Sequence, residues 1–306
     1  MTPWPAKTRE LVNRHMDSRV WNRFALRDGD VVVASYAKSG TTWVQQIVTQ
    51  LIHHGAEDAP VATLSPWLDY RLTPPEVLER LAAQVHRRVV KTHLPLDALG
   101  ISPRARYLYV ARDGRDVAMS LHHHHGCGNA LWYERLNAGP AELGPPMTPP
   151  LGDPAAYFRA WLGGDGAPFW PYFENIRTWW PAQGLPNVLF LHFNALKADL
   201  LGQVRRIAAF LDLALDEALL ARVLDHASFG YMRAHAEDVA PLGGRIFEGG
   251  AQSFLHHGEN GRWRAVLSEA DAATYEARAR AELGSECAQW LATGLPSPPA
   301  TASPRA

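Results

Sequence analysis

Short apolar runs bounded by turn residues mark the first structural elements along the chain. The clearest is Val31-Val32-Val33, which follows a turn at Asp28-Gly29 and predicts a strand over Asp30–Tyr36. An unbroken apolar run of this kind is typical of a parallel strand that is buried on both faces. The same reasoning predicts further strands at Val89–Val90, Tyr107–Ala111 and Val188–Phe193.

Between the predicted strands, apolar residues recur at helical spacing. The segment Thr42–His54 is predicted to be a helix, because one of its faces gathers Trp43, Ile47, Val48, Leu51 and Ile52. Further helices are predicted from about Asp116, over Leu200–Leu211, over Asp216–His226, and from a capping sequence at Ser268 to about Trp290.

The order of these elements predicts an α/β fold with a central parallel sheet flanked by helices on both faces. Each strand is separated from the next by a stretch long enough for a crossover connection. No linker or repeat divides the chain, so we expect a single domain over 1–293 and a disordered tail over 294–306. The Pro- and Gly-rich segment 139–154 predicts a long irregular connection, which is either a lid or binding loop or a disordered stretch.

Composition and charge exclude several classes of function. The net charge of −1 provides no global basic field, so no nucleic-acid partner is expected and any anion binding must arise from local geometry. Cys127 and Cys287 are too few for a disulfide framework or a zinc cluster, which suits a reducing cytoplasm. No apolar run approaches the ~20 residues that cross a bilayer, and the first residues lack the features of a signal peptide. We therefore expect a cytoplasmic location and no membrane span.

The segment Tyr36–Trp43, which joins the first predicted strand to its helix, has the features of an anion site. Backbone N–H groups at a helix N-terminus lack internal partners, and the helix dipole favours negative charge there. Lys38 adds a positive charge, and Thr41 and Thr42 add hydroxyl donors. The match to the P-loop of nucleotide triphosphatases is poor, because the first glycine is missing and Lys38 precedes Gly40. Alone, the segment fits either a phosphate site or a polar turn that caps a helix.

Three further motifs favour the phosphate site. Val90–Pro95 reads VKTHLP, Tyr109–Ser120 reads YVARDGRDVAMS, and Phe254–Trp263 reads FLHHGENGRW. Together with AKSGTTW at 37–43, and in this order, they resemble the cytosolic sulfotransferase family, its bacterial branch in particular. The resemblance extends from about Asp30 to Trp263. It implies a P-loop-like fold and transfer of a sulfuryl group from 3′-phosphoadenosine 5′-phosphosulfate (PAPS) to a small-molecule acceptor.

The resemblance also implies which residues hold the donor. The residues that match the 5′ phosphosulfate site are Lys38, Ser39, Gly40, Thr41 and Thr42, and Trp43 matches the residue that stacks on adenine. Arg112 and Ser120 match the positions that hold the 3′ phosphate, where arginine offers a planar fork of donors and serine a short one. Because eight residues of helix span ~12 Å, the Arg112 side chain is expected to fold back toward Ser120.

Three residues are expected to be catalytic by the same resemblance. His93 follows a predicted parallel strand, at the carboxyl end where open α/β sheets bind ligands, and would be the general base. An unperturbed pKa of ~6.5 suits this chemistry at neutral pH. Lys38 would neutralise the bridging oxygen as the sulfuryl group departs, and Lys91 would steady the sulfuryl oxygens.

The run His122–His125 has too few suitably placed ligands for a metal. Helical residues four apart share a face, so one histidine pair would still need ligands from outside the run. We interpret the run as helix surface and the edge of a pocket, and we expect no metal.

The sequence departs from the family pattern at the adenine and 3′-phosphate ends. Phe193 stands where many relatives carry tyrosine, and Phe229 matches the second aromatic contact to adenine. His256-His257-Gly258 stands where the animal enzymes have Arg-Lys-Gly on the 3′ phosphate. Because histidine is a weaker and pH-dependent cation, donor affinity is expected to be lower or to rise as the pH falls. The short dimer motif of animal relatives is lacking, so the oligomeric state stays open.

Two other functions remain open at this point. A P-loop small-molecule kinase would need a Walker-type lysine and acidic Mg²⁺ ligands after a strand, yet the fourth strand leads into Asn194-Ala195. A non-catalytic nucleotide-binding protein on the same fold is disfavoured by the presence of Lys38, Lys91 and His93. The acceptor is expected to be a small aromatic or hydrophobic molecule that reacts through a hydroxyl group or an amine. Residues that line its pocket or, alternatively, pack in a core are Trp67, Tyr70, Trp132, Tyr133, Trp161, Phe169 and Trp170.

Overall fold

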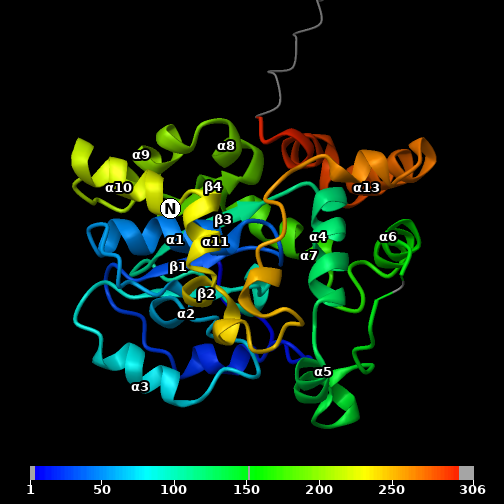
Figure 1. Cartoon of the computed structure of the whole chain (residues 1–306), viewed down its shortest axis with the longest axis horizontal. Helices are drawn as coiled ribbons and strands as arrows, with labels where there is room; N and C mark the ends of the chain where they lie inside the picture. The colour runs from blue at the N-terminus through cyan, green and yellow to red at the C-terminus, as the bar shows by residue number, and fades with distance from the viewer. Residues whose placement is uncertain (1–3, 151, 296–306) are drawn as a thin grey trace, which may run out of the picture.

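A computed structural model describes residues 4–150 and 152–295. Within these residues, four parallel strands form one sheet in the order β2-β1-β3-β4 (Figure 1). The strands are β1 (Val31–Ala34), β2 (Val89–Thr92), β3 (Arg106–Ala111) and β4 (Val188–His192). All three pairings are parallel, so the predicted class of fold is confirmed.

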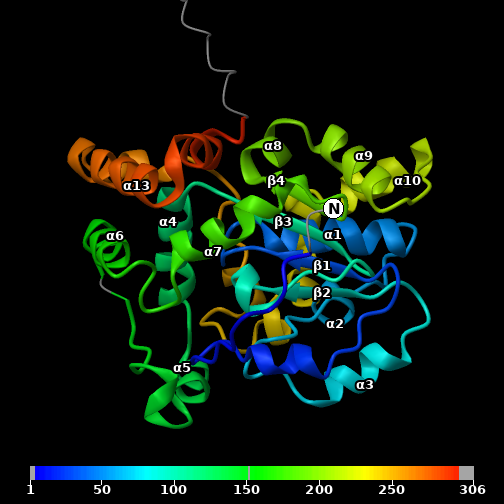
Figure 2. The same ribbon diagram turned by 180° about the vertical axis from the view of Figure 1, so that it is seen from behind.

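Helices connect and cover the strands. The α-helices are α1 (Thr41–Ile52), α2 (Val61–Leu64), α3 (Glu76–Ala83), α4 (Gly114–Gly126), α5 (Ala130–Asn137), α6 (Pro154–Gly163), α7 (Tyr172–Trp179), α8 (Phe193–Ala198), α9 (Leu200–Phe210), α10 (Glu217–His226), α11 (Phe229–Ala234), α12 (Ala236–Val239) and α13 (Glu269–Thr293). Single 3₁₀ turns occupy Ser18–Asn22, Leu96–Ala98, Ala141–Leu143, Trp180–Gly184, Pro241–Gly244, Gly250–Ser253 and Arg262–Ala265. Seen from behind, α3 and α13 lie at opposite ends of the molecule (Figure 2). No helix in the described ranges is both long and apolar enough to span a membrane.

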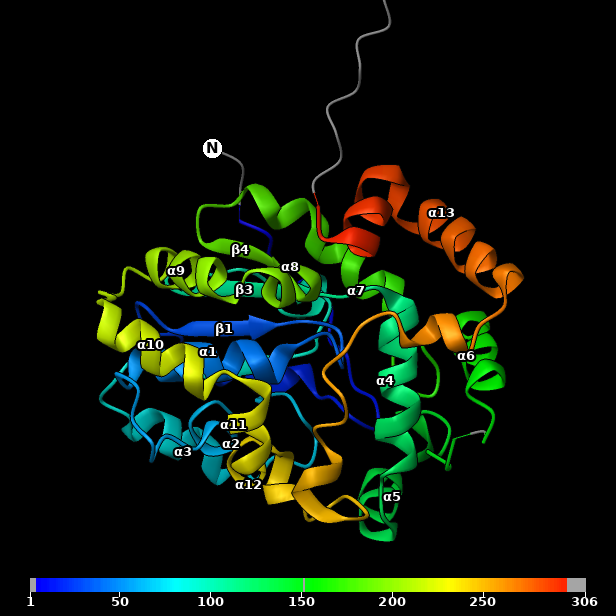
Figure 3. The same ribbon diagram turned by 45° about the horizontal axis from the view of Figure 1, so that its top comes forward.

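Consecutive residues of a strand point to opposite faces of the sheet, and apolar side chains of helices cover both faces. Val31 and Val33 pack with apolar residues of α1, α9 and α10. Val32 and Ala34 pack with those of α4, α6, α7 and α13. In Figure 3, α9 and α10 stand at one side of the molecule and α4, α6 and α13 stand together at the other. Two apolar layers therefore explain why the sequence of β1 shows no alternation of apolar and polar residues.

Several predicted element boundaries are wrong by one or two residues. β1 ends at Ala34, and the chain bends from Tyr36 into the loop before α1. Phe193 begins α8 and does not end β4. α4 begins at Gly114 and not near Asp116, since the carboxylate of Asp113 caps the helix by accepting a hydrogen bond from the Arg115 N–H. These local hydrogen bonds leave no trace in the apolar pattern.

The C-terminal helix and the Pro- and Gly-rich segment also depart in part from expectation. The capping box predicted at Ser268 is confirmed, but Gly284, with φ of +76°, interrupts the helical backbone of α13. The described part of 139–153 is irregular apart from one 3₁₀ turn, and Pro154 already begins α6. Arg14 holds this segment by donating to the carbonyls of Gly144 and Pro145. Most of the predicted disordered tail, residues 296–306, lies outside the described residues.

Candidate active site

The loop between β1 and α1 has a backbone that few residue types adopt without strain. Lys38 has a φ of +61° and Gly40 a φ of +104°. A Cβ at Gly40 would lie 2.8 Å from Cδ2 of Phe193, which is inside contact distance. Glycine is therefore required at position 40 for both space and conformation. α1 begins directly after Gly40, so its first unpaired N–H groups face this loop, which is the geometry of an anion site.

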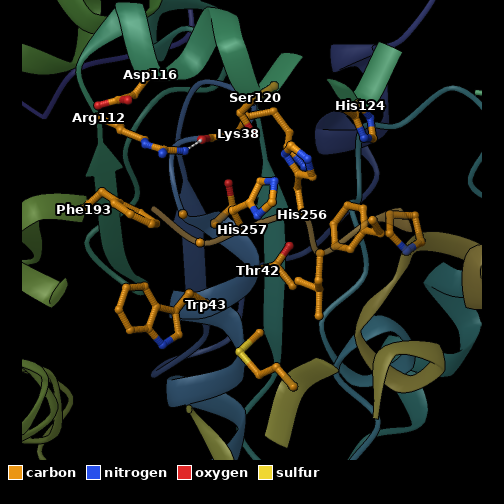
Figure 4. A pocket seen from close by; sticks show the side chains of 18 of the residues that line it. Lys38, Thr42, Trp43, Arg112, Asp116, Ser120, His124, Phe193, His256 and His257 are labelled. Atoms are coloured by element: carbon orange, nitrogen blue, oxygen red, sulfur yellow. Dashed lines mark hydrogen bonds between the residues drawn. The ribbon is translucent and has the colours of Figure 1, made fainter. Parts of the chain in front are cut away.

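A cavity of about 410 Å³ lies where the four strands end. Its wall contains most of the residues that the sequence predicted for the site: Lys38, Gly40, Thr41, Thr42, Trp43, Lys91, His93, Arg112, Ser120, Phe193, Phe229, His256, His257 and Gly258. Ser39 is the exception, because it is buried beside the cavity, with no hydrogen-bond partner for its Oγ among the described residues. Arg112, Phe193 and Trp43 lie on one side of the view in Figure 4, and His124 lies on the other.

His93 is held in one orientation by a backbone carbonyl. Its Nδ1 lies 2.7 Å from the carbonyl oxygen of Ser35, and since a carbonyl only accepts, Nδ1 carries the proton. The other ring nitrogen, Nε2, is then the basic one. Burial, followed by the nearby charge of Lys91, lowers the pKa of His93 well below its ordinary value of 6.5. The ring is therefore neutral at pH 7 and ready to accept a proton.

Two lysines face the same cavity, of which Lys91 is buried and Lys38 is partly buried. Burial lowers the pKa of Lys38 to about 7, with further contributions from Lys91 and Arg112. Burial also lowers the pKa of Lys91 to about 8. The Nζ atom of Lys38 lies 4.6 Å from the ring centroid of Phe254, and that of Lys91 lies 4.9 Å from the ring of Trp67. A dianionic ligand in the cavity would favour the charged form of both amines.

Asp69, which the sequence did not predict as part of the site, holds one of the rings that contact His93 and Lys91. Its buried carboxylate accepts hydrogen bonds from the indole N–H groups of Trp21 (2.8 Å) and Trp67 (2.5 Å). Burial raises the pKa of Asp69 to about 6. The indole of Trp67 in turn packs edge-on against His93, with 4.6 Å between ring centroids. Asp69 thus fixes the ring that contacts both His93 and Lys91.

Arg112 joins three distant segments of the chain at the edge of the cavity. Its Nε donates to Oδ1 of Asn260 (2.8 Å), its Nη1 to the carbonyl of Lys38 (3.2 Å), and its Nη2 to the carbonyl of Glu259 (2.7 Å). Arginine has five N–H donors, so two remain for a ligand. Arg112 and Ser120 both line the cavity.

His256, one of the two histidines near the predicted 3′-phosphate position, differs from the expectation of a weak cation. The ring of His256 stacks on His123 at 3.5 Å and accepts a hydrogen bond at Nδ1 from Nη1 of Arg262, at 2.9 Å. Burial and the adjacent His123 lower the pKa of His256 to about 3, so this ring is an uncharged acceptor at pH 6 to 8. Arg262 itself lines the cavity. The sequence motif contained this arginine, but its role could not be read without the turn that brings it to His256.

Aromatic rings line the expected adenine position. Trp43 is fixed by a hydrogen bond from its indole N–H to the carbonyl of Ala227 (2.8 Å) and meets Phe193 edge-on, at 5.5 Å between ring centroids. Phe229 is 39% exposed and lies close to Gly258, where a Cβ would be 2.9 Å from Cδ2 of the ring. Flat, partly exposed rings of this kind suit the stacking of a base.

Five of the seven aromatic residues considered for the acceptor pocket line the cavity. These five are Trp67, Tyr70, Trp132, Phe169 and Trp170. Tyr133 and Trp161 are not in its wall. Trp161 is fully buried, and its ring packs against Tyr172 at 5.1 Å. Sequence alone could not separate the two groups, since aromatic side chains serve cores and pockets equally well.

The four consecutive histidines have different surroundings. His124 lines the cavity, as the predicted pocket edge requires, whereas His125 is buried and His123 contacts His256. Among the described residues, no group of three or more His, Cys, Asp or Glu side chains is placed to hold a metal ion.

The fold and the cavity define a class of protein with many known members. The family model of the sulfotransferase domain matches residues 28–286. The chain belongs to the sulfotransferase family. A glycolipid sulfotransferase of Mycobacterium bovis is 31% identical over 282 residues, which cover 85% of this chain and 86% of that protein. Mouse sulfotransferase 1B1 is 27% identical over 273 residues, which cover 84% of each chain.

Solved structures agree with this assignment. Retinol dehydratase in a complex with retinol and PAP has a TM-score of 0.64 and 26% identity, over 87% of this chain and 84% of that one. Mouse sulfotransferase SULT7A1 complexed with PAP has a TM-score of 0.69 at 20% identity, over 89% and 90% of the two chains, and shares the fold.

Proposed function

We propose that the chain transfers a sulfuryl group from PAPS to a hydroxyl group, or an amine, of a small hydrophobic or aromatic acceptor. The observation that carries this proposal is the hydrogen bond from Nδ1–H of His93 to the carbonyl of Ser35, because it leaves Nε2 as the base inside a cavity shared with two lysines. Membership of the sulfotransferase family supports the reaction type. The PAP in related solved structures supports PAPS as the donor.

The residues in the donor half of the cavity fit a molecule with two separated phosphate groups. Lys38, the first N–H groups of α1 and Thr42 would surround one phosphate, and Ser39 is buried beside this position. The two unused N–H groups of Arg112, with Ser120 and Arg262, surround the other position. Trp43, Phe193 and Phe229 supply rings for a base.

The proposed step is an in-line displacement at sulfur. The acceptor oxygen forms a bond to sulfur, the bond from sulfur to the bridging oxygen breaks with its electron pair remaining on the 5′ phosphate, and the acceptor proton passes to Nε2 of His93. Negative charge grows on the bridging oxygen, so a protonated Lys38 stabilises the transition state more than the bound donor. Lys91, whose Nζ lies 4.9 Å from the ring centroid of Trp67, would neutralise the sulfuryl oxygens.

The alternatives are less well supported. A kinase would need acidic Mg²⁺ ligands after a strand, and β4 leads into Phe193-Asn194-Ala195 instead.

Cys127 and Cys287 are both free thiols, which supports action in the reducing cytoplasm. Because three mycobacterial relatives are glycolipid sulfotransferases, glycolipids belong among the acceptors to be tested.

The test combines an acceptor screen with a variant of the base. Purified protein with sulfur-labelled PAPS should label a phenol, a hydrophobic alcohol, an amine or a glycolipid. His93→Ala should retain PAP affinity within about 2-fold and lose transfer by ~10²-fold or more, the range for a general base. His86→Ala is the matched control, since His86 lies before β2, away from the cavity. Unchanged transfer in His93→Ala would refute the assigned base, and PAP binding without labelling of any acceptor would favour a non-catalytic protein.

A further inference from the structure

His15 lies in the wall of the cavity, although nothing in the sequence distinguished it. Its side chain comes from the N-terminal segment, and the residue is 3% exposed. The ring packs against Phe169 at 5.2 Å and against Trp170 at 5.4 Å between centroids. Trp170 also packs against His93, at 5.5 Å, so one indole contacts both the proposed base and His15. Nε2 of His15 is buried and makes no hydrogen bond with the described residues.

His124, on α4, is a second ring in this wall without a hydrogen bond. It packs against Phe247 at 5.1 Å and Phe254 at 6.0 Å, and its buried Nδ1 has no partner in the described part of the chain. Trp132 contacts both histidines, with 6.4 Å to His15 and 5.7 Å to His124. The two rings are thus polar groups whose immediate neighbours are aromatic side chains.

Buried polar atoms without partners are uncommon, because desolvation without a new hydrogen bond is unfavourable. Burial lowers the pKa of His15 to about 3 and that of His124 well below 6.5, so both rings are neutral at pH 7. A neutral imidazole has one donor and one acceptor nitrogen and therefore suits a hydroxyl or a carbonyl. The mechanism proposed above uses neither ring. A ligand group that completes their hydrogen bonds would account for both.

We propose that His15 and His124 bind a second, uncharged oxygen of the acceptor while its reacting hydroxyl faces His93; this inference rests on the proposed function. The acceptor is then a flat, neutral, aromatic or polycyclic molecule with oxygens at two separate positions. A cationic second group is disfavoured, because the positive charges of Lys38 and Lys91 act on His124 across the cavity. An acceptor with a single hydroxyl leaves both ring nitrogens unpaired.

The experiment compares two acceptors that differ by one oxygen, 2-naphthol and 2,6-dihydroxynaphthalene. For the wild-type protein, we expect kcat/KM to be ~10-fold higher for the diol, after halving for its two equivalent hydroxyls. His15→Phe and His124→Phe should each bring this ratio close to one. His15→Gln keeps a hydrogen-bonding group and should restore part of the preference. His86→Phe, outside the cavity, should retain the wild-type ratio.

Binding measurements separate this inference from the proposed function. The dissociation constants of PAP, and of each naphthol for the PAP complex, are measured by calorimetry for every variant, which also shows that each variant is folded. A wild-type ratio near one, a preference preserved in both Phe variants, or failure to sulfate either naphthol despite PAP binding would each overturn the role of His15 and His124. Failure of the wild-type protein to bind PAP would instead refute the proposed function.

Discussion

Raising the pH from 7 to 8 should weaken the binding of PAP through Lys38. In the free protein, the pKa of Lys38 is lowered to about 7 and that of Lys91 to about 8, chiefly by burial. An anionic ligand favours the protonated amines and so raises both pKa values. PAP affinity is therefore fully developed below the pKa of the free lysines and declines as the pH rises through them.

The magnitude follows from the protonated fractions. With a pKa near 7, Lys38 is half protonated at pH 7 and ~9% protonated at pH 8, so its share of the change is a ~5-fold increase in the dissociation constant of PAP, or ~1 kcal/mol. Lys91 adds less than ~2-fold over the same interval. The same linkage predicts uptake of ~0.6 proton per PAP at pH 7 from the two lysines together. The ligand contributes little, because a phosphate monoester completes its ionisation near pH ~6.

Calorimetry at pH 7 and pH 8, in two buffers with different ionisation enthalpies, measures both the affinity and the proton uptake. Lys38→Arg is the control for the source of the effect, since a guanidinium does not titrate in this range. In this variant, the dissociation constant of PAP should change between pH 7 and pH 8 only by the smaller factor that comes from Lys91. Equal wild-type affinity at the two pH values without proton uptake would refute the reasoning, and so would an undiminished pH dependence in Lys38→Arg.

Two further predictions concern PAP binding and the loop. Arg262→Ala should weaken PAP binding ~3- to 10-fold by removing one charged contact, whereas Arg264→Ala, outside the cavity wall, should not; equal effects would contradict a local role. Gly40→Ala should lower the free energy of unfolding by ~1–3 kcal/mol and impair PAP binding, because the new methyl group meets Phe193 at a positive φ. Gly184→Ala, which enters open space, should be close to neutral in urea unfolding, and a similar loss in both variants would argue against the steric explanation.

The sequence predicted those elements that can be recognised from a few consecutive residues. The run Val31–Val33 is buried on both faces of the sheet, so its apolar pattern was enough to place a strand. The loop with Lys38 and Gly40 could be recognised because both its glycine and its position before a helix are visible in a few consecutive residues. Phe193 was placed in the wrong element, since one residue decides where a buried strand ends and a buried helix begins.

The parts of the site that could not be predicted depend on contacts between distant segments. Asp69 and His15 are single polar residues that no motif singles out, and they reach Trp67 and Trp170 only after the chain has folded. Trp161 was considered for the pocket and lies in the core, because burial and pocket lining call for the same side chain. Such residues are distinguished by their neighbours in space, which hydrophobic periodicity does not record.

The three hydrogen bonds of Arg112 have a consequence for the timing of activity during synthesis. A growing chain that has emerged as far as residue 250 already contains the four strands, His93 and both lysines. It still lacks Glu259 and Asn260, which hold Arg112 in place, and Arg262, which completes the proposed 3′-phosphate position. Incomplete or truncated chains are therefore expected to bind the proposed donor more weakly than the complete protein.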